Sequence, residues 1–121
     1  MTLYFSRALK LNSPKEFKSV RRTGRKLVVN GIRAYSQKNQ LVSPRLGLVI
    51  AKREIPKAVT RNYVKRIIRE GFRLNQHYLT NVDIIVFVHK QALAQEKWHF
   101  QDCINKLWQK LSVYCENQPS F

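Results

Sequence analysis

The stretch 52-KREIPKAVTRNYVKRIIREGFR-73 decides how this chain is organised. Its apolar side chains recur at the spacing of a helix that packs on a core, at Val64, Ile67, Ile68, Gly71 and Phe72. Its cations recur every fourth residue and form a second side, called here the basic series: Lys57, Arg61, Lys65, Arg69 and Arg73. Like charges at this spacing repel by roughly 0.2–0.5 kcal/mol per pair, and the only acid within the series is Glu70. Such a helix is expected to face a polyanion, and an ordinary solvated basic face is the less favoured interpretation.

The charge of the whole chain supports this expectation. The 121 residues contain 23 Lys and Arg against seven Asp and Glu, a formal net charge of +16. Residues 1–73 hold 19 of the cations and three of the acids, while residues 74–121 hold four of each. This asymmetry predicts a dedicated surface for a polyanion, with nucleic acid as the partner. An anionic membrane is the weaker alternative, because the chain has no long uncharged apolar run that would span or anchor.

Length, N-terminal composition and cysteines set further bounds. We expect one domain over residues 1–121, because this length supports a core without disulfides or metals. The N-terminus lacks the apolar segment typical of a signal peptide, so we expect a cytoplasmic protein. Cys103 and Cys115 lack the spacing of a disulfide framework and are predicted to be reduced, partly buried thiols. Residues 1–12 are predicted to form a flexible basic arm, and residues 115–121 a frayed tail.

The predicted elements follow in the order helix, three strands, helix, strand, helix. Ser13, Pro14 and Glu16 are the residue types of a capped helix start, and Gly24 is typical of a helix end. The other predicted elements are strands over 27–35 (interrupted by a turn signal at 30–31) and 32–37, a strand over 45–52, a helix over 56–75, a strand over 83–89 and a helix over 95–112. In the second strand, alternation places Arg33, Tyr35 and Gln37 on one face.

The strand, helix and strand between residues 45 and 89 predict a βαβ unit with parallel outer strands. From sequence physics alone the connection would be right-handed, the hand that dominates such units. The final helix places Phe100, Ile104, Leu107, Trp108 and Leu111 on one face, so it is predicted to be a packing helix.

Several segments together resemble the bacterial ribonuclease P protein component. The central stretch carries the dipeptides of that family's signature helix: Ala58-Val59, Arg61-Asn62, Lys65-Arg66, Arg69-Glu70 and Phe72-Arg73. The resemblance runs in order through residues 7–111. Glu16-Phe17-x-x-Val20-x-x-x-Gly24 is similar to the family's first helix, and Arg45-Leu46-Gly47-Leu48 to its central strand. Such a collinear set is far more specific than any single motif.

The resemblance implies an α+β fold, a single-domain α/β sandwich in the order αβββαβα with a central sheet and an unusual left-handed βαβ crossover. It also implies the protein subunit of ribonuclease P, the ribonucleoprotein endonuclease that removes the 5′ leader from precursor tRNA. In such an enzyme the RNA subunit carries the chemistry with Mg²⁺. The protein binds the catalytic RNA and the single-stranded leader, which broadens substrate affinity and lowers the magnesium requirement. No obligate protein partner is predicted.

The resemblance further assigns residues to the two RNA contacts. Contacts to the catalytic RNA are expected from the polar positions of the signature and from the basic series: Lys52, Arg53, Lys57, Arg61, Asn62, Lys65, Arg66, Arg69 and Arg73. The leader is expected in a cleft between the sheet and the signature helix, with Phe17 and Tyr35 as aromatic walls and Arg21 and Arg33 as cations.

Three departures from the family's pattern affect these assignments. Tyr63 replaces the third cation of the family's Arg-Asn-Arg triplet, and Ile55-Pro56 replaces a small flexible residue before the helix. Arg21 stands where another cleft aromatic is common, so leader contacts are expected to be more electrostatic and less stacked.

The residues themselves offer no site for catalysis by the protein. Metal-assisted phosphodiester cleavage needs convergent carboxylates, and the seven acids form no D-x-D or E-x-x-H cluster. His77 and His89 lack a partner pattern, and His99 with Cys103 supplies only two possible ligands. We therefore predict no catalytic residue and no metal site on the protein.

Two questions of role stay open at this point. Trp98 and Trp108 are predicted to be core residues rather than a stacking platform, whereas spacing alone leaves Phe17 equally a core anchor or a cleft wall. A ribosomal or other structural RNA-binding protein would share the size and charge but would show no leader-dependent affinity. A stand-alone metal nuclease would cleave precursor tRNA without added RNA, and it would need carboxylates that this chain lacks.

Overall fold

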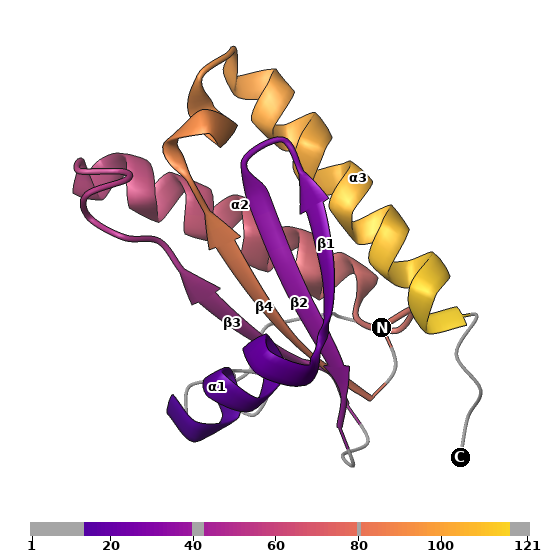
Figure 1. Ribbon diagram of the computed structural model, residues 1–121. Coiled ribbons are helices and arrows are strands. Elements are labelled where there is room, and N and C mark those ends of the chain that lie inside the picture. Colours follow the sequence, from indigo (N-terminus) through magenta and orange to yellow (C-terminus); the bar gives the residue numbers. More distant parts are fainter. Residues whose placement is uncertain (1–13, 40–42, 80, 117–121) are drawn as a thin grey trace.

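The computed structural model describes residues 14–39, 43–79 and 81–116, and Figure 1 shows helices arranged around one sheet. The elements are α1 (Pro14–Thr23), β1 (Arg25–Val29), β2 (Ile32–Lys38), β3 (Arg45–Val49), α2 (Ala58–Asn75), β4 (Val82–Val88), the short 3-10 helix η2 (Lys90–Leu93) and α3 (Lys97–Glu116). This order confirms the predicted αβββαβα arrangement. The predicted basic arm and residues 117–121 of the predicted tail lie outside the described residues, whereas residues 115 and 116 continue α3.

The element boundaries differ from the predicted ones where the backbone turns early. The hairpin of β1 and β2 turns at Asn30-Gly31 as predicted, with φ of 38° and 80°, the positive values that tight hairpin turns require. The strand predicted over 45–52 ends at Val49, because a turn follows in which the amides of Glu54 and Ile55 both donate to the carbonyl of Ala51. Helix α2 begins at residue 58 rather than 56, since residue 57 is still extended.

The four strands have the order β1-β2-β4-β3, with β2 antiparallel to both neighbours and β3 parallel to β4. In Figure 1, β3 and β4 both run toward the upper left, β4 lies to the right of β3, and α2 passes behind the sheet. This arrangement is a left-handed crossover. The resemblance therefore gave the correct hand, and the general preference for right-handed connections did not.

The sheet separates a large apolar cluster from a small one. The large cluster joins one sheet face to α2 and α3, and Val64, Ile68 and Phe72 are fully buried in it, as the predicted apolar stripe requires. The small cluster lies on the opposite face, where Val20 of α1 packs on Tyr35 and Ile85. Because α1 is short, it leaves part of this second face open.

Helices α2 and α3 cross at a glycine. A Cβ atom at Gly71 would lie 2.1 Å from Nε1 of Trp108, so the contact needs a residue without a side chain. Trp108 is buried, as predicted, but the same prediction for Trp98 is wrong, because that side chain is 67% exposed. Trp98 precedes Phe100, the first buried residue of the α3 packing stripe, and projects from another side of the helix.

Candidate RNA-binding surfaces

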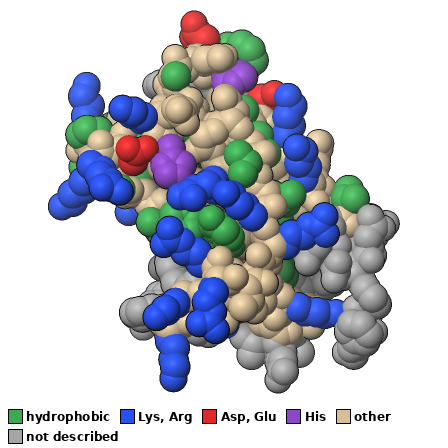
Figure 2. Space-filling model, in the orientation of Figure 1, with side chains coloured by type: hydrophobic (Ala, Val, Ile, Leu, Met, Phe, Trp, Pro, Cys, Tyr) green, Lys and Arg blue, Asp and Glu red, His purple; other side chains and the backbone are tan. Residues whose placement is uncertain are grey.

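An open hollow lies on the sheet face that α1 covers only in part. The residues that line it come from α1, β2, the end of β3, the following turn and the end of β4: Arg21, Arg33, Val49, Ala51, Arg53, Glu54, Phe87, Val88 and His89. Figure 2 views this face and shows an apolar patch bordered by Lys and Arg, with an acidic side chain beside a histidine. The hollow therefore combines an apolar floor with a basic rim.

Two guanidinium groups converge on one aromatic ring in this hollow. The Cζ atoms of Arg21 and Arg33 each lie 5.3 Å from the centre of the Phe87 ring. A cation at this distance over a ring is attracted to its electron-rich face. The Tyr35 ring supports Phe87 from the side, with centroids 5.6 Å apart and planes at 83°. The arrangement gathers positive charge where a phosphate would relieve the repulsion between the two arginines.

A chain of hydrogen bonds holds Arg33 in this position. Its Nε donates to Nε2 of His89 over 3.0 Å, and its Nη1 donates to the Tyr35 hydroxyl over 3.4 Å. Nδ1 of His89 lies 3.1 Å from Oε1 of Glu54, which also accepts the backbone N–H of Lys90 over 3.3 Å. The Lys90 amide above all, and then the His89 hydrogen bond, lower the pKa of Glu54 below its usual value. The carboxylate is therefore ionised at neutral pH.

Three of the four predicted leader-cleft residues lie in or beneath this hollow, not between the sheet and α2. Arg21 and Arg33 line it, and Tyr35 lies below them in the small cluster, 9% exposed. The expectation that Tyr35 faces the signature helix is wrong, because alternation along β2 points Tyr35 toward α1 while Ala34 faces α2. The side chain of Phe17 lies outside the described residues.

The predicted site residues did not include Glu54, Phe87 or His89. The strand that carries Phe87 was predicted without its neighbour β2 in the sheet, so the position of Phe87 opposite Arg33 was not recognised. Pairing that strand with β2 would have revealed it, since residues opposite each other in neighbouring strands share a face. Arg53, which was predicted to contact the catalytic RNA, lies among the residues that line the hollow.

The second surface is the outer side of α2. Four of its predicted RNA-binding residues are exposed: Lys57, Asn62, Arg66 and Arg69. Lys52 is also exposed in the turn after β3, and Lys65 is partly exposed. The polar positions of the signature therefore reach solvent, away from the buried stripe of α2.

Two members of the basic series have partners within the protein. Nη1 of Arg61 donates to the carbonyls of Ile55 and Pro56, over 2.9 and 2.7 Å, and so holds the segment that leads into α2. Arg73 forms an ion pair with Glu70, one turn away, which lowers the pKa of Glu70. The series is therefore less uniformly repulsive than its spacing predicts.

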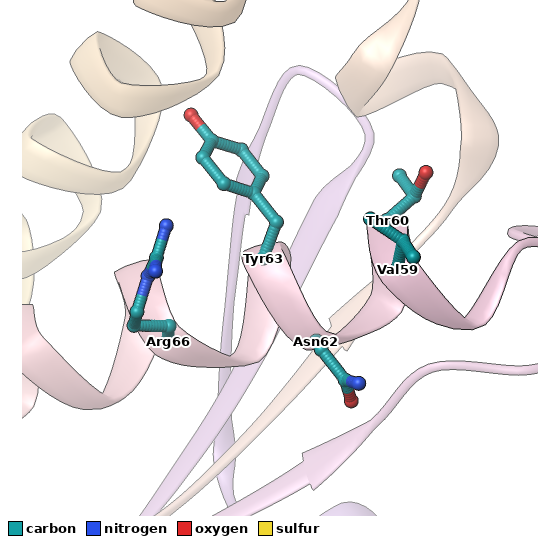
Figure 3. Close-up of a pocket in the computed structure, with 5 residues that line it drawn as sticks. All are labelled: Val59, Thr60, Asn62, Tyr63 and Arg66. Atoms are coloured by element: carbon teal, nitrogen blue, oxygen red, sulfur yellow. The ribbon is translucent and has the colours of Figure 1, made fainter.

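A further hollow lies on α2 itself, lined by Val59, Thr60, Asn62, Tyr63 and Arg66. In Figure 3, Tyr63 and Arg66 point to the same side of the helix and Asn62 points to the other. The guanidinium of Arg66 lies 5.8 Å from the Tyr63 ring, and that ring also packs against the large cluster. Where the family's triplet has a third cation, this chain thus has the Tyr63 ring, which supports the neighbouring cation Arg66.

The acidic residues and cysteines form no metal site in the ranges that the structure describes. No group of three or more His, Cys, Asp or Glu is placed there to hold an ion. Asp83 is engaged by Arg45, whose Nε and Nη2 donate to its two oxygens over 2.9 and 2.7 Å. Cys103 is a free thiol, as predicted, and is more fully buried than expected, while the side chain of Cys115 is not described. None of the described helices is long and apolar enough to cross a membrane.

Comparison with known proteins agrees with this architecture. The family model described as ribonuclease P matches residues 5–112. The ribonuclease P protein of Staphylococcus aureus is 24% identical with a TM-score of 0.79, over 89% of this chain and 99% of that one. The Thermotoga maritima ribonuclease P protein in complex with 1-(4-fluorophenyl)-2-thiourea is 26% identical with a TM-score of 0.73, over 84% and 98%.

Proposed function

The chain belongs to the bacterial ribonuclease P protein family, and on this premise we propose that its two basic surfaces bind different RNAs. It is the protein subunit of an endoribonuclease ribonucleoprotein that processes the 5′ end of tRNA. We assign the outer side of α2 to the catalytic RNA and the hollow on the α1 side of the sheet to the single-stranded leader of precursor tRNA.

The hollow carries this proposal through the pairing of Arg21 and Arg33 over Phe87. Proteins hold single strands by following the phosphates with cations and by stacking bases on rings or guanidinium planes. The hollow offers both kinds of group within one small area, and Arg53 adds a third cation to its rim. Duplex RNA would contact such a recess poorly, because its bases are stacked inside the helix.

The surface of α2 has a different character that suits a folded RNA. Its predicted RNA contacts are cations and an amide spread from Lys57, just before the helix, to Arg69 in its second half, beside the exposed Val59 and Glu70. Contacts of this kind bind phosphates without reading sequence, and their strength falls as salt rises. A protein of net charge +16 would also screen RNA phosphates that otherwise require cations. We therefore propose that it lowers the Mg²⁺ requirement of the RNA-containing enzyme, with the ion held by RNA.

The test uses holoenzyme reconstituted with a bacterial ribonuclease P RNA. Dissociation constants for precursor and mature tRNA are measured at several salt concentrations for wild type, Arg21→Ala and Arg33→Ala. The matched control is Lys110→Ala, an exposed cation on α3 at the other side of the sheet. We expect both arginine variants to weaken precursor binding selectively, and to reduce its salt slope by about 0.7 for each lost phosphate contact.

Equal weakening of precursor and mature tRNA binding by the arginine variants would refute the leader assignment.

A cleavage assay provides a second test. Protein without RNA should not cleave precursor tRNA, and its addition to the catalytic RNA should restore 5′ maturation at low Mg²⁺. Magnesium-dependent cleavage by RNA-free protein that survives repurification would contradict the division of roles between protein and RNA.

A further inference from the structure

Contacts with two other segments hold Arg33 in the hollow. It leaves β2, crosses the face of Phe87 on β4 and donates to His89, which follows β4. His89 in turn contacts Glu54, which belongs to the turn after β3. Three segments far apart in the sequence thus meet at one guanidinium group.

The donors and acceptors in this chain determine the state of the histidine. A guanidinium nitrogen can only donate a hydrogen bond, so Nε2 of His89 must accept one from Arg33. Neutral imidazole then carries its proton on Nδ1 and donates it to the Glu54 carboxylate, 3.1 Å away. The Lys90 amide holds the same carboxylate oxygen at 3.3 Å. The direction of each hydrogen bond therefore runs consistently from Arg33 through His89 to Glu54.

We propose that Glu54 and His89 are positioning residues that hold Arg33 over Phe87 to bind a phosphate of the precursor-tRNA leader. This inference rests on the proposed function of the hollow and identifies what orders its central cation. An arginine side chain on a surface loses considerable rotamer freedom when it binds. Fixing it beforehand removes that cost from the binding step.

Charge alone would assign Glu54 the opposite role. Glu54 is the single acid among the described residues that line the hollow, where Arg21, Arg33 and Arg53 supply the cations. Removing an anion from a phosphate-binding site should strengthen binding by simple electrostatics. If Glu54 positions Arg33, removal of the hydrogen-bonding group of Glu54 should instead weaken binding of the leader. Two substitutions that remove the same charge but differ in hydrogen bonding separate these effects.

The experiment compares matched pairs of variants in the reconstituted holoenzyme. Glu54→Gln and Glu54→Leu both remove the negative charge, and only glutamine keeps an oxygen that can accept from His89. His89→Gln and His89→Leu are both uncharged, and only glutamine can accept from Arg33 while donating to Glu54. For each variant, the ratio of the dissociation constants for precursor and mature tRNA reports leader binding. Thermal unfolding of the free protein shows which variants fold.

We expect each leucine variant to lose leader selectivity relative to its glutamine partner by about 2- to 12-fold, the change that corresponds to one ordinary hydrogen bond. Affinity for the catalytic RNA should stay constant. In an Arg33→Ala background, His89→Leu should have no further effect on selectivity, because a positioning residue acts only through the group that it positions.

Each failure has a distinct signature. If Arg33→Ala itself leaves the ratio unchanged, the leader assignment of the hollow is wrong. If Arg33→Ala raises the dissociation constant for precursor tRNA relative to that for mature tRNA but the leucine and glutamine variants agree, the leader assignment stands and the positioning role is refuted. A full effect of His89→Leu in the Arg33→Ala background would also overturn it, since the histidine would then act on its own.

Discussion

Replacement of Arg61 by alanine should destabilise the protein, although Arg61 belongs to a series of residues that would otherwise be assigned to RNA. Its Nη1 donates to the carbonyls of Ile55 and Pro56 over 2.9 and 2.7 Å. A hydrogen bond from a charged donor is worth about 1.5–3 kcal/mol when it is well shielded. Arg61 is partly exposed and Pro56 is exposed, so water replaces part of what is lost. We expect a loss of about 1–2 kcal/mol in the free energy of unfolding, after this discount for exposure.

For a domain of this length, the loss corresponds to a decrease in Tm of about 4–10 °C. The assay is thermal unfolding of the free protein, with Arg69→Ala as the control because Arg69 is an exposed member of the same series. Arg69→Ala should change stability by less than about 0.5 kcal/mol, as is usual for surface positions. Binding to the catalytic RNA should show the reverse order, with Arg69→Ala having the larger effect. Arg69→Ala should flatten the salt dependence of RNA binding by roughly 0.7–0.9 in log–log slope for a lost phosphate contact.

A third variant separates the charge of residue 61 from its hydrogen bonds. Arg61→Lys keeps the cation but cannot reproduce the position of Nη1 between the two carbonyls, since lysine is a shorter point charge. Arg61→Lys should lose most of the stability that Arg61→Ala loses, and it should keep the wild-type salt dependence of binding to the catalytic RNA. If Arg61→Ala unfolds at the wild-type temperature while Arg69→Ala loses several degrees, the structural role assigned to Arg61 is incorrect.

Three further substitutions test the packing that supports the two surfaces. Gly71→Ala should lower stability by about 1–3 kcal/mol despite the better helix propensity of alanine, because its Cβ would lie 2.1 Å from Trp108 Nε1; a higher midpoint in urea would contradict this. Asp83→Ala should cost about 3–5 kcal/mol in the same assay, because it leaves Arg45, whose side chain is only 18% exposed, without its carboxylate. Tyr35→Phe should change stability by less than about 1 kcal/mol and leave leader selectivity nearly intact, since it removes only a 3.4 Å hydrogen bond from Arg33. A large loss of selectivity would instead assign the Tyr35 hydroxyl a direct contact.

The fold was predictable wherever local signals and periodicity agreed. Asn30-Gly31 specified a hairpin, and the spacing of Val64, Ile68 and Phe72 specified the buried side of α2. Both features arise from neighbours in the sequence, which is the information that periodicity contains. The hand of the βαβ unit is different, because it depends on how whole elements pack. There the general preference favoured the wrong hand, and only the family resemblance gave the observed one.

The candidate sites were predictable to the extent that charge and a shared strand face determine them. Alternation correctly placed Arg33 and Tyr35 together on one side of β2. It could not show which element covers that side, so Tyr35 was expected to face the signature helix, whereas it packs against Val20 of α1. Phe87 and His89 were not predicted as site residues, because Phe87 is one of many apolar residues in its strand and His89 follows the end of that strand. Their importance depends on strand pairing, which brings Arg33 opposite Phe87.

The two proposed RNA surfaces are joined by the short segment between β3 and α2. Residues 53 and 54 of this segment line the hollow, whereas Ile55, directly after them, is buried in the large cluster with only 4% of its surface exposed. Arg61 then fixes the carbonyls of Ile55 and Pro56 from the first turns of α2. The residues that line the hollow and the two carbonyls that Arg61 holds are therefore directly adjacent in the chain. Under the proposed function this anchor by Arg61 has a consequence, because a leader bound in the hollow would have to be held at a fixed distance from the catalytic RNA. Loosening the anchor through Arg61→Ala should thus weaken leader selectivity in addition to stability, even though Arg61 is not among the residues that line the hollow.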